Sequence, residues 1–117
     1  MDGILERGPV KRVSEALAAN GMGKIHVLAD SARTAQDAAT ALNIEVGQIA
    51  SSIVFKLPDG KPLLVITSGR HRVDTSVVAS LLKVESLGRA DADYVKESSG
   101  YSVGGVAPIG WTNAPAT

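Results

Sequence analysis

Two β-rich runs joined by a Pro-Asp-Gly turn constrain the fold more than any other part of this sequence. The runs are residues 52–57 (SIVFKL) and residues 62–67 (PLLVIT), and Pro58-Asp59-Gly60 lies between them. Branched and aromatic side chains favour strands, and an Asp-Gly pair favours the tight turn of a hairpin. The sequence therefore predicts an antiparallel hairpin. The second run is almost continuously apolar, which predicts a strand covered on both faces.

Helical patterns lie on both sides of this hairpin. A first-turn proline and a helical spacing of apolar residues predict a helix over residues 9–20. Thr34 is the expected cap of a second helix over residues 35–42. After the hairpin, Asp74 is the expected cap of a third helix, and a fourth is expected over residues 90–98.

Two shorter runs complete the pattern of elements. Residues 25–28 (IHVL) and the entry to the glycine-rich tail at residues 101–103 (YSV) are expected to be strand-like. Because helices and strands are interspersed and the hairpin is antiparallel, we predict an α/β fold of the mixed α+β kind. We expect a mixed, partly barrel-like sheet with peripheral helices.

Length and composition exclude several classes of protein. The chain has 117 residues, the size of one domain, so residues 1–117 are expected to form a single unit. Cysteine is absent, which excludes disulfides and cysteine-based zinc sites. Twelve basic residues balance twelve acidic ones, which excludes a broad DNA-coating field but allows a local basic patch. No apolar run approaches the roughly 18 residues of a membrane span, so we expect a cytoplasmic protein without membrane contact.

A glycine-rich segment near the end of the sequence is the strongest candidate for chemistry. Residues 104–110 (GGVAPIG), called the glycine loop below, contain three glycines and a proline. Exposed backbone N–H groups there could approach a ligand closely or stabilise an oxyanion. The segment is neither a Walker loop nor a GxGxxG motif. The alternative is a tight β-turn with a bulge, and spacing alone favours that turn.

A short basic cluster follows the second strand. Arg70, His71 and Arg72 place two guanidinium groups and an imidazole together, which suits a phosphate or a carboxylate. The alternative is that both arginines are solvated and that Arg72 pairs with Asp74.

Two serines and a second histidine are weaker candidates. Ser51 and Ser52 stand at the entrance of the first strand, where their hydroxyls could bind substrate. Local hydrogen bonding to the backbone is the favoured alternative for both. His26 is expected to be structural, because two histidines without cysteine are a poor set of metal ligands. We therefore predict neither a metal nor a cofactor.

Several ordered segments together point to one family. They are ARTAQDAA at 32–39, VGQI at 46–49, SIVF at 52–55, SG-x-x-RVD at 68–74, LGRA at 87–90 and GGVAPIG at 104–110. In this order they resemble the YbaK-type aminoacyl-tRNA deacylases, also called prolyl-tRNA-synthetase-associated editing domains. The similarity runs from about residue 26 to residue 110.

The resemblance implies hydrolysis of the ester between a wrong, small amino acid and the 3′ end of a tRNA, with serine, alanine, cysteine and proline as candidates. In such enzymes the glycine loop holds the aminoacyl carbonyl through backbone groups, and the terminal ribose hydroxyl assists the attacking water. On this basis Gly104 and Gly105 carry the backbone role, Pro108 and Gly110 shape the loop at the substrate, and Arg72 contacts the nucleotide end. The implied partners are mischarged tRNA and an aminoacyl-tRNA synthetase.

Two departures from the family pattern define an alternative. Many members carry a substrate-orienting lysine where this sequence has Ser51, and members continue for some tens of residues past the loop, whereas this sequence stops at Thr117. Ser51 therefore stays a candidate catalytic position. The alternative is a catalytically weak or inactive module that binds tRNA or a synthetase, and a homodimer could cover its short sheet edge. An unrelated small-molecule binder that holds an anion with Arg70 and Arg72 has the least support.

Overall fold

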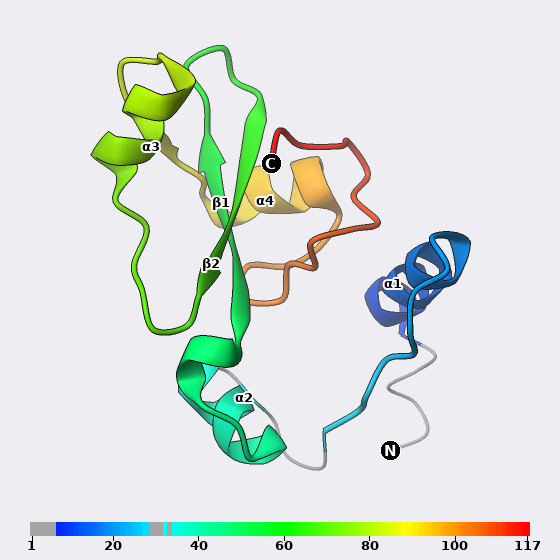
Figure 1. Cartoon of the computed structure of the whole chain (residues 1–117). Coiled ribbons are helices and arrows are strands. Elements are labelled where there is room, and N and C mark those ends of the chain that lie inside the picture. The colour runs from blue at the N-terminus through cyan, green and yellow to red at the C-terminus, as the bar shows by residue number, and fades with distance from the viewer. Residues whose placement is uncertain (1–6, 29–31, 33) are drawn as a thin grey trace.

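Helices surround a short sheet in this computed structural model, which describes residues 7–28, 32 and 34–117 (Figure 1). The helices are α1 (Gly8–Ala19), α2 (Ala35–Leu42), the 3-10 helix η1 (Val46–Gln48), α3 (Thr75–Leu82) and α4 (Ala92–Ser99). The strands are β1 (Ala50–Lys56), β2 (Pro62–Ser68) and β3 (Gly88–Arg89). The predicted α/β fold of the mixed kind is confirmed.

The hairpin formed by β1 and β2 is the centre of the sheet. The two strands pair antiparallel from Ala50 opposite Ser68 to Lys56 opposite Pro62. The turn closes with a hydrogen bond of 2.8 Å from the Gly60 N–H to the Leu57 carbonyl. Gly60 has a φ of +88°, which glycine adopts at no steric cost. The predicted hairpin is therefore confirmed.

The sheet is open rather than barrel-like. Its three strands lie in the order β2-β1-β3, and β3 pairs with β1 only at Phe55 and Lys56. Among the described residues the one parallel pairing is an isolated bridge between Leu63 and Ala116. The expectation of a partly closed sheet is wrong for this part of the chain, because a two-residue strand cannot carry the sheet round into a barrel.

The helix ends follow the predicted caps. The Thr34 hydroxyl accepts a hydrogen bond of 3.0 Å from the Asp37 N–H at the start of α2. That helix ends where Asn43 adopts a left-handed φ of 56°. The Asp74 carboxylate accepts hydrogen bonds from two backbone N–H groups in the first turn of α3. All four predicted helices form, with bounds close to those expected.

Strand predictions outside the hairpin are wrong. Residues 25–28 and 101–103 form no strand. A strand is stable only beside a hydrogen-bonded neighbour, so a short apolar run without one stays irregular.

Coverage of β2 on both faces is only partly as predicted. Leu63 and Leu64 are 3% and 1% exposed, so both faces are covered at the start of the strand. Ile66 is 46% exposed, so coverage is lost further along. The C-terminal segment reaches β2 only at its start, where the Leu64 N–H donates to the Ala116 carbonyl at 2.8 Å.

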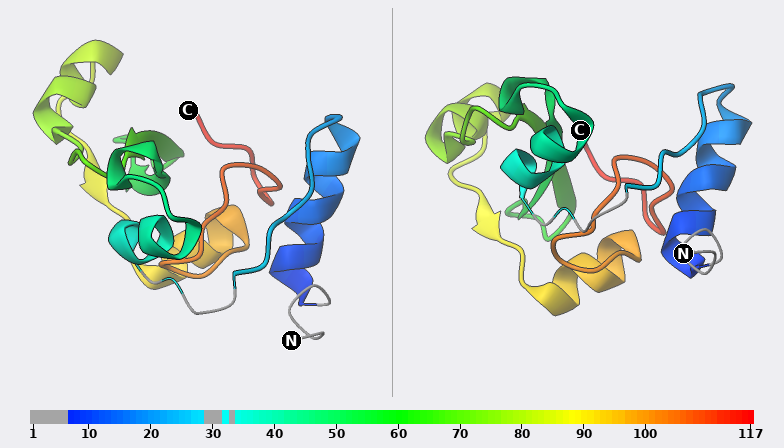
Figure 2. Two further views of the ribbon diagram at one scale, coloured as in Figure 1. Left: turned by 60° about the horizontal axis from the view of Figure 1, so that its bottom comes forward. Right: turned by 90° about the horizontal axis from the view of Figure 1, so that it is seen from below.

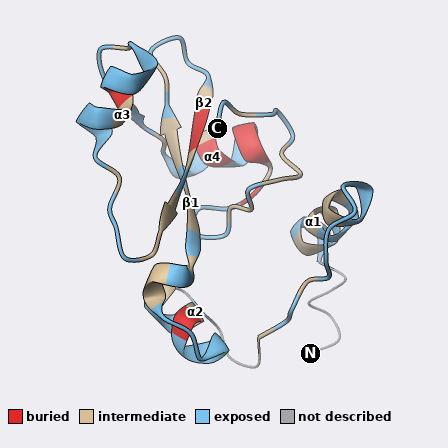
Figure 3. Cartoon of the chain, in the orientation of Figure 1, coloured by how far each residue is buried: buried red, intermediate tan, exposed pale blue. Residues whose placement is uncertain are grey.

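Most of the buried residues lie on β2, on α4 and just after α4, and single buried residues lie on α2 and α3 (Figure 3). The apolar residues under 5% exposed are Ala39, Leu63, Leu64, Ala79, Val95 and Tyr101. Helix α1 contributes none of them and stands to one side, with the segment after α4 between it and the sheet (Figure 2). Within the described ranges no helix has the length and apolarity to cross a bilayer.

Candidate functional site

Adjacent serines on β1 face two different pockets. Successive side chains of a strand point to opposite faces of a sheet. Ser52 lines a pocket together with Gly104, and Ser51 lines another together with Arg72. These two are called the Gly104 pocket and the Arg72 pocket below. The structure therefore divides the predicted site residues between two faces.

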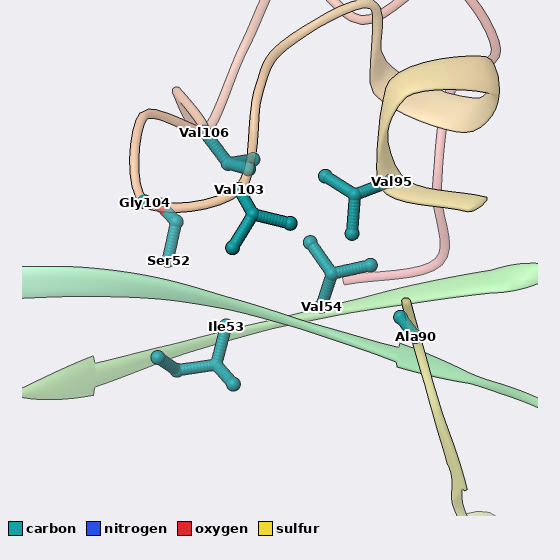
Figure 4. A pocket seen from close by; sticks show the side chains of 8 residues that line it. All are labelled: Ser52, Ile53, Val54, Ala90, Val95, Val103, Gly104 and Val106. Atoms are coloured by element: carbon teal, nitrogen blue, oxygen red, sulfur yellow. The ribbon is translucent and has the colours of Figure 1, made fainter. Parts of the chain in front are cut away.

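The Gly104 pocket is small and has uncharged walls. Its volume is about 260 Å³. In Figure 4 the side chains of Ser52 and Val54 point toward the glycine loop, whereas that of Ile53 extends to the other side of the strand. The lining residues are Ser52, Ile53, Val54, Ala90, Val95, Val103, Gly104 and Val106. Four of these eight residues are valines, which come from β1, from α4 and from the segment after α4.

A β-turn presents Gly104 to this pocket. The Gly105 N–H donates to the Ser102 carbonyl at 2.9 Å. Gly104 lies third in this turn with a φ of +84°, and a positive φ at that position favours glycine. The tight turn that spacing favours is present, and Gly104 lines the pocket as part of it.

The two glycines of this turn differ in what their N–H groups can do. Among the described residues no carbonyl accepts from the Gly104 N–H. The Gly105 N–H is already bonded, and Gly105 is not among the lining residues. Of the two, Gly104 is the one whose backbone donor can turn to a ligand. The catalytic role of either glycine stays a prediction.

Pro108 and Gly110 lie at the base of the glycine loop. Pro108 is exposed, and neither residue lines either pocket. Gly110 has a φ of +73°, and a Cβ there would lie 2.7 Å from the Tyr101 hydroxyl. Gly110 therefore allows a close approach within the fold, and the substrate-binding role of both residues stays a prediction.

The Arg72 pocket lies on the opposite face of the hairpin and carries most of the polar candidates. Its volume is about 320 Å³. An apolar floor meets three hydroxyls, an imidazole and a guanidinium group. The lining residues are Ala35, Ser51, Ile53, Phe55, Thr67, Gly69, His71, Arg72, Val73 and Thr75. The structure thus brings Ser51, His71 and Arg72 together.

Arg70 is separated from the other two members of the basic cluster. Its Nη2 lies 3.6 Å from Glu45 Oε2, and both side chains are exposed. Both arginines are exposed, as the alternative expected, but its ion pair of Arg72 with Asp74 is wrong, because the pair of Arg70 with Glu45 is the one ion pair among the described residues. The Asp74 carboxylate instead caps α3. Arg72 is left to face its pocket.

The hydroxyls of Ser51 and Ser52 make no hydrogen bond to a described residue. Among the described serines, Ser68 and Ser99 are those whose hydroxyls donate to the backbone, at 2.7 Å to the Gly47 carbonyl and at 2.6 Å to the Val95 carbonyl. Local backbone bonding, the favoured alternative for Ser51 and Ser52, is therefore wrong. Both hydroxyls remain able to bond to a substrate.

The two pockets meet at β1. Ile53 lines both of them. Since β3 pairs only with Phe55 and Lys56, no described strand lies against residues 50–54 on that side of β1. A ligand longer than one pocket can therefore extend around this edge from one face to the other.

The sequence did not reveal the valines of the Gly104 pocket or the role of Arg12. The valines of the Gly104 pocket come from three separate segments, so no local spacing reveals that they converge. Arg12, in α1, donates to carbonyls of residues 99 and 110 at the base of the glycine loop. An arginine within a predicted amphipathic helix gives no signal of so distant a contact.

A protein-family model and several individual proteins are similar to this chain. The family model described as "Aminoacyl-tRNA editing domain" matches residues 29–116. A proline–tRNA ligase from Bacillus licheniformis is 35% identical over 80 residues, which are 68% of this chain and 14% of the ligase. One from Limosilactobacillus fermentum is 34% identical over 83 residues. The chain therefore spans 14% of the length of each ligase.

A solved structure shares nearly the whole fold. It is a protein proposed as a trans-editing enzyme for prolyl tRNA synthetase, with 37% identity and a TM-score of 0.84. The alignment covers 94% of this chain and 71% of that one.

Proposed function

The chain belongs to the aminoacyl-tRNA editing domain family, and from this premise we propose that it hydrolyses the ester joining a small, wrong amino acid to the 3′ end of a tRNA. The observation that carries the proposal is the Gly104 pocket. It joins a backbone donor, a hydroxyl and a small apolar cavity at one point, as an aminoacyl ester requires.

The size of the Gly104 pocket supports a small amino acid. Pockets for drug-sized ligands have volumes of roughly 300–1,000 Å³, and this one has about 260 Å³. Its valine walls give apolar contact to a short side chain. We assign alanine, serine, cysteine and proline as the side chains to test, bound against Val54, Val103 and Val106.

The backbone of Gly104 supports the chemical step. When water adds to the ester carbonyl carbon, negative charge develops on the carbonyl oxygen, and a preorganised N–H stabilises it. The intermediate then releases the ribose oxygen, which takes up a proton, and leaves the free amino acid. No lining residue of the pocket carries an acid–base side chain. We therefore assign activation of the water to the neighbouring ribose hydroxyl of the substrate, as the family resemblance implies.

The Arg72 pocket supports binding of the nucleotide end. Arg72 offers a planar set of donors to a phosphate, and His71 and Ser51 stand beside it. The shared residue Ile53 and the unpaired edge of β1 let one substrate occupy both pockets. In this arrangement the amino acid lies on one face of the sheet and the terminal nucleotide on the other.

The relatives suggest which tRNA to test first. Two are proline–tRNA ligases, and the structural neighbour is proposed to act for prolyl tRNA synthetase. We propose a tRNA for proline carrying a wrong, small amino acid as the substrate, and a synthetase as the partner.

A deacylation assay tests the function. The purified chain is mixed with tRNA for proline charged with alanine, serine, cysteine or proline, and release of the amino acid is followed over time. We expect turnover of at least one ester, and a kcat lower by about 100-fold or more after Gly104 is replaced by valine. Binding of tRNA without hydrolysis of any ester would overturn the proposal in favour of a non-catalytic module.

A further inference from the structure

Helix α1 lies outside the segment that matches the family model, yet one of its side chains reaches the base of the glycine loop. The match begins at residue 29, and α1 ends at Ala19. Arg12, on α1, donates from Nε to the Gly110 carbonyl at 2.8 Å and from Nη2 to the Ser99 carbonyl at 2.9 Å. The segment 100–110 contains the glycine loop; the Ser99 carbonyl directly precedes it and the Gly110 carbonyl lies at its end. One guanidinium group is therefore hydrogen-bonded at both ends of this segment.

Tyr101 adds further contacts that hold the two ends of this segment together. Its ring lies under the Arg12 guanidinium, 4.4 Å from Cζ to the ring centre, and the residue is 1% exposed. Its hydroxyl donates to the Ile109 carbonyl at 2.7 Å, with the Gly110 carbonyl 3.3 Å away. The aromatic residue at the start of the segment is thereby bonded to its end.

The backbone at both ends is adapted to this contact. Gly100 and Gly110 have φ values of +81° and +73°. A Cβ on Gly100 would lie 2.5 Å from Arg12 Nη2, and one on Gly110 would lie 2.7 Å from the Tyr101 hydroxyl. Only glycine leaves space for the guanidinium group and the phenol at these points.

The tip of the loop is held by fewer contacts: besides the turn bond from the Gly105 N–H to the Ser102 carbonyl, the nearest described anchor is the Trp111 Nε1–H, which donates to the Ala107 carbonyl at 2.7 Å. Val103 is 60% exposed, and Gly104 has nothing within 4 Å of its Cβ position. The position of Gly104 at the pocket therefore depends on how firmly the base is held.

We propose that Arg12 is a positioning residue for the deacylation step: by tying Ser99 to Gly110, it keeps Gly104 aimed into the Gly104 pocket. This inference rests on the proposed function. Small displacements of a catalytic group cost large factors in rate, about 100-fold for roughly 1 Å. A planar guanidinium group donates to two carbonyls from separate nitrogens while its face stacks on a ring, a geometry that the compact ammonium of lysine does not reproduce. Lysine is therefore expected to replace Arg12 poorly.

The test compares Arg12→Met and Arg12→Lys with Lys11→Met, an exposed neighbour on the same helix. Three quantities are measured on the folded chains: kcat and KM for a mischarged tRNA, and amide hydrogen exchange at Gly105, whose N–H bonds to the Ser102 carbonyl at the loop tip. We expect Arg12→Met to lower kcat about 10- to 100-fold with KM nearly unchanged, and to speed exchange at the loop tip. Arg12→Lys should behave almost like Arg12→Met, and Lys11→Met like the unchanged chain.

Other outcomes separate this inference from the proposed function. If Arg12→Met lowers thermal stability but leaves kcat and loop exchange unchanged, Arg12 only anchors α1 and the inference is wrong. If the unchanged chain hydrolyses no ester, the proposed function fails, while the exchange data still decide whether Arg12 holds the loop. Should Arg12→Met fail to fold, Tyr101→Phe removes the bonds to residues 109 and 110 alone and is expected to lower kcat in the same direction.

Discussion

The Gly104 pocket and the Arg72 pocket share one strand, yet their walls differ in chemistry. The Gly104 pocket has valine walls, one serine hydroxyl and a backbone donor. The Arg72 pocket combines an apolar floor with three hydroxyls, an imidazole and a guanidinium group. Because neighbouring residues of a strand point to opposite faces, Ser51 and Ser52 belong to different pockets although they are adjacent in sequence.

This difference indicates that the two pockets recognise different parts of the substrate, the amino acid in one and the nucleotide in the other. A site that recognises the amino acid affects kcat and the choice of side chain. A site that recognises the nucleotide affects KM equally for every amino acid, and its contribution weakens as salt screens the phosphates. Variants on the two faces should therefore change different kinetic quantities.

The largest effect is expected at Gly104. Valine at a φ of +84° is strained because a β-branched side chain is disfavoured there. Gly104→Val should reorient the turn and its N–H, and lower kcat by about 100-fold or more, as loss of an oxyanion donor does. Steady-state deacylation kinetics measure the effect.

Gly105→Val is the matched control for that variant. Its φ lies outside the left-handed region, and a Cβ there would meet only the Ser102 carbonyl at 3.7 Å. We expect a thermal midpoint close to that of the unchanged chain and a much smaller loss of kcat. Equal losses in both variants would show that the left-handed turn at Gly104 has no special role.

A smaller effect is expected in the Arg72 pocket. Arg72→Ala should raise KM about tenfold, since a hydrogen bond to a charged group contributes roughly 1.5–3 kcal/mol. It should leave kcat unchanged and weaken the salt dependence of KM. Arg70→Ala is the control, because Arg70 pairs with Glu45 and does not line the pocket. If the two variants raise KM equally, the pocket is not where the nucleotide binds.

The smallest effect is expected for Ser51→Lys, which introduces the residue that the family resemblance leads us to expect at this position. A partly exposed ammonium group near a phosphate contributes little, so KM should fall about threefold. Selectivity among amino acids should not change, because position 51 faces away from the Gly104 pocket. Kinetics with two mischarged tRNAs check both statements, and a large gain in kcat would place position 51 at the reacting ester.

The hairpin and the helices could be predicted from sequence because their signals are local. Thr34, Asp74 and the Pro58-Asp59-Gly60 turn each act within a few residues, and each has the predicted role. The strand expected over residues 25–28 failed because pairing depends on a partner elsewhere in the chain. The open sheet could not be foreseen for the same reason, since nothing local shows that β3 is only two residues long.

The candidate site was predictable by residue type and less so by arrangement. The glycine loop and the basic cluster are visible in the sequence, and both contribute to pockets. Their separation by face follows from strand alternation only once the register of β1 is known. Arg70 is separated from Arg72 by its contact with Glu45, and Arg12 reaches the loop from more than 80 positions away. Neither contact leaves a local pattern.

The division between the two pockets is tested most directly by the selectivity of Val106→Ala compared with that of Val73→Ala. Both valines are half-buried, and each lines one pocket. The quantity measured is the ratio of kcat/KM for a larger and a smaller amino acid on the same tRNA. In Val106→Ala the ratio should shift about tenfold toward the larger amino acid, as expected for an apolar wall that loses methyl groups, and in Val73→Ala it should stay unchanged. A shift in Val73→Ala alone would contradict this division and place the amino acid in the Arg72 pocket.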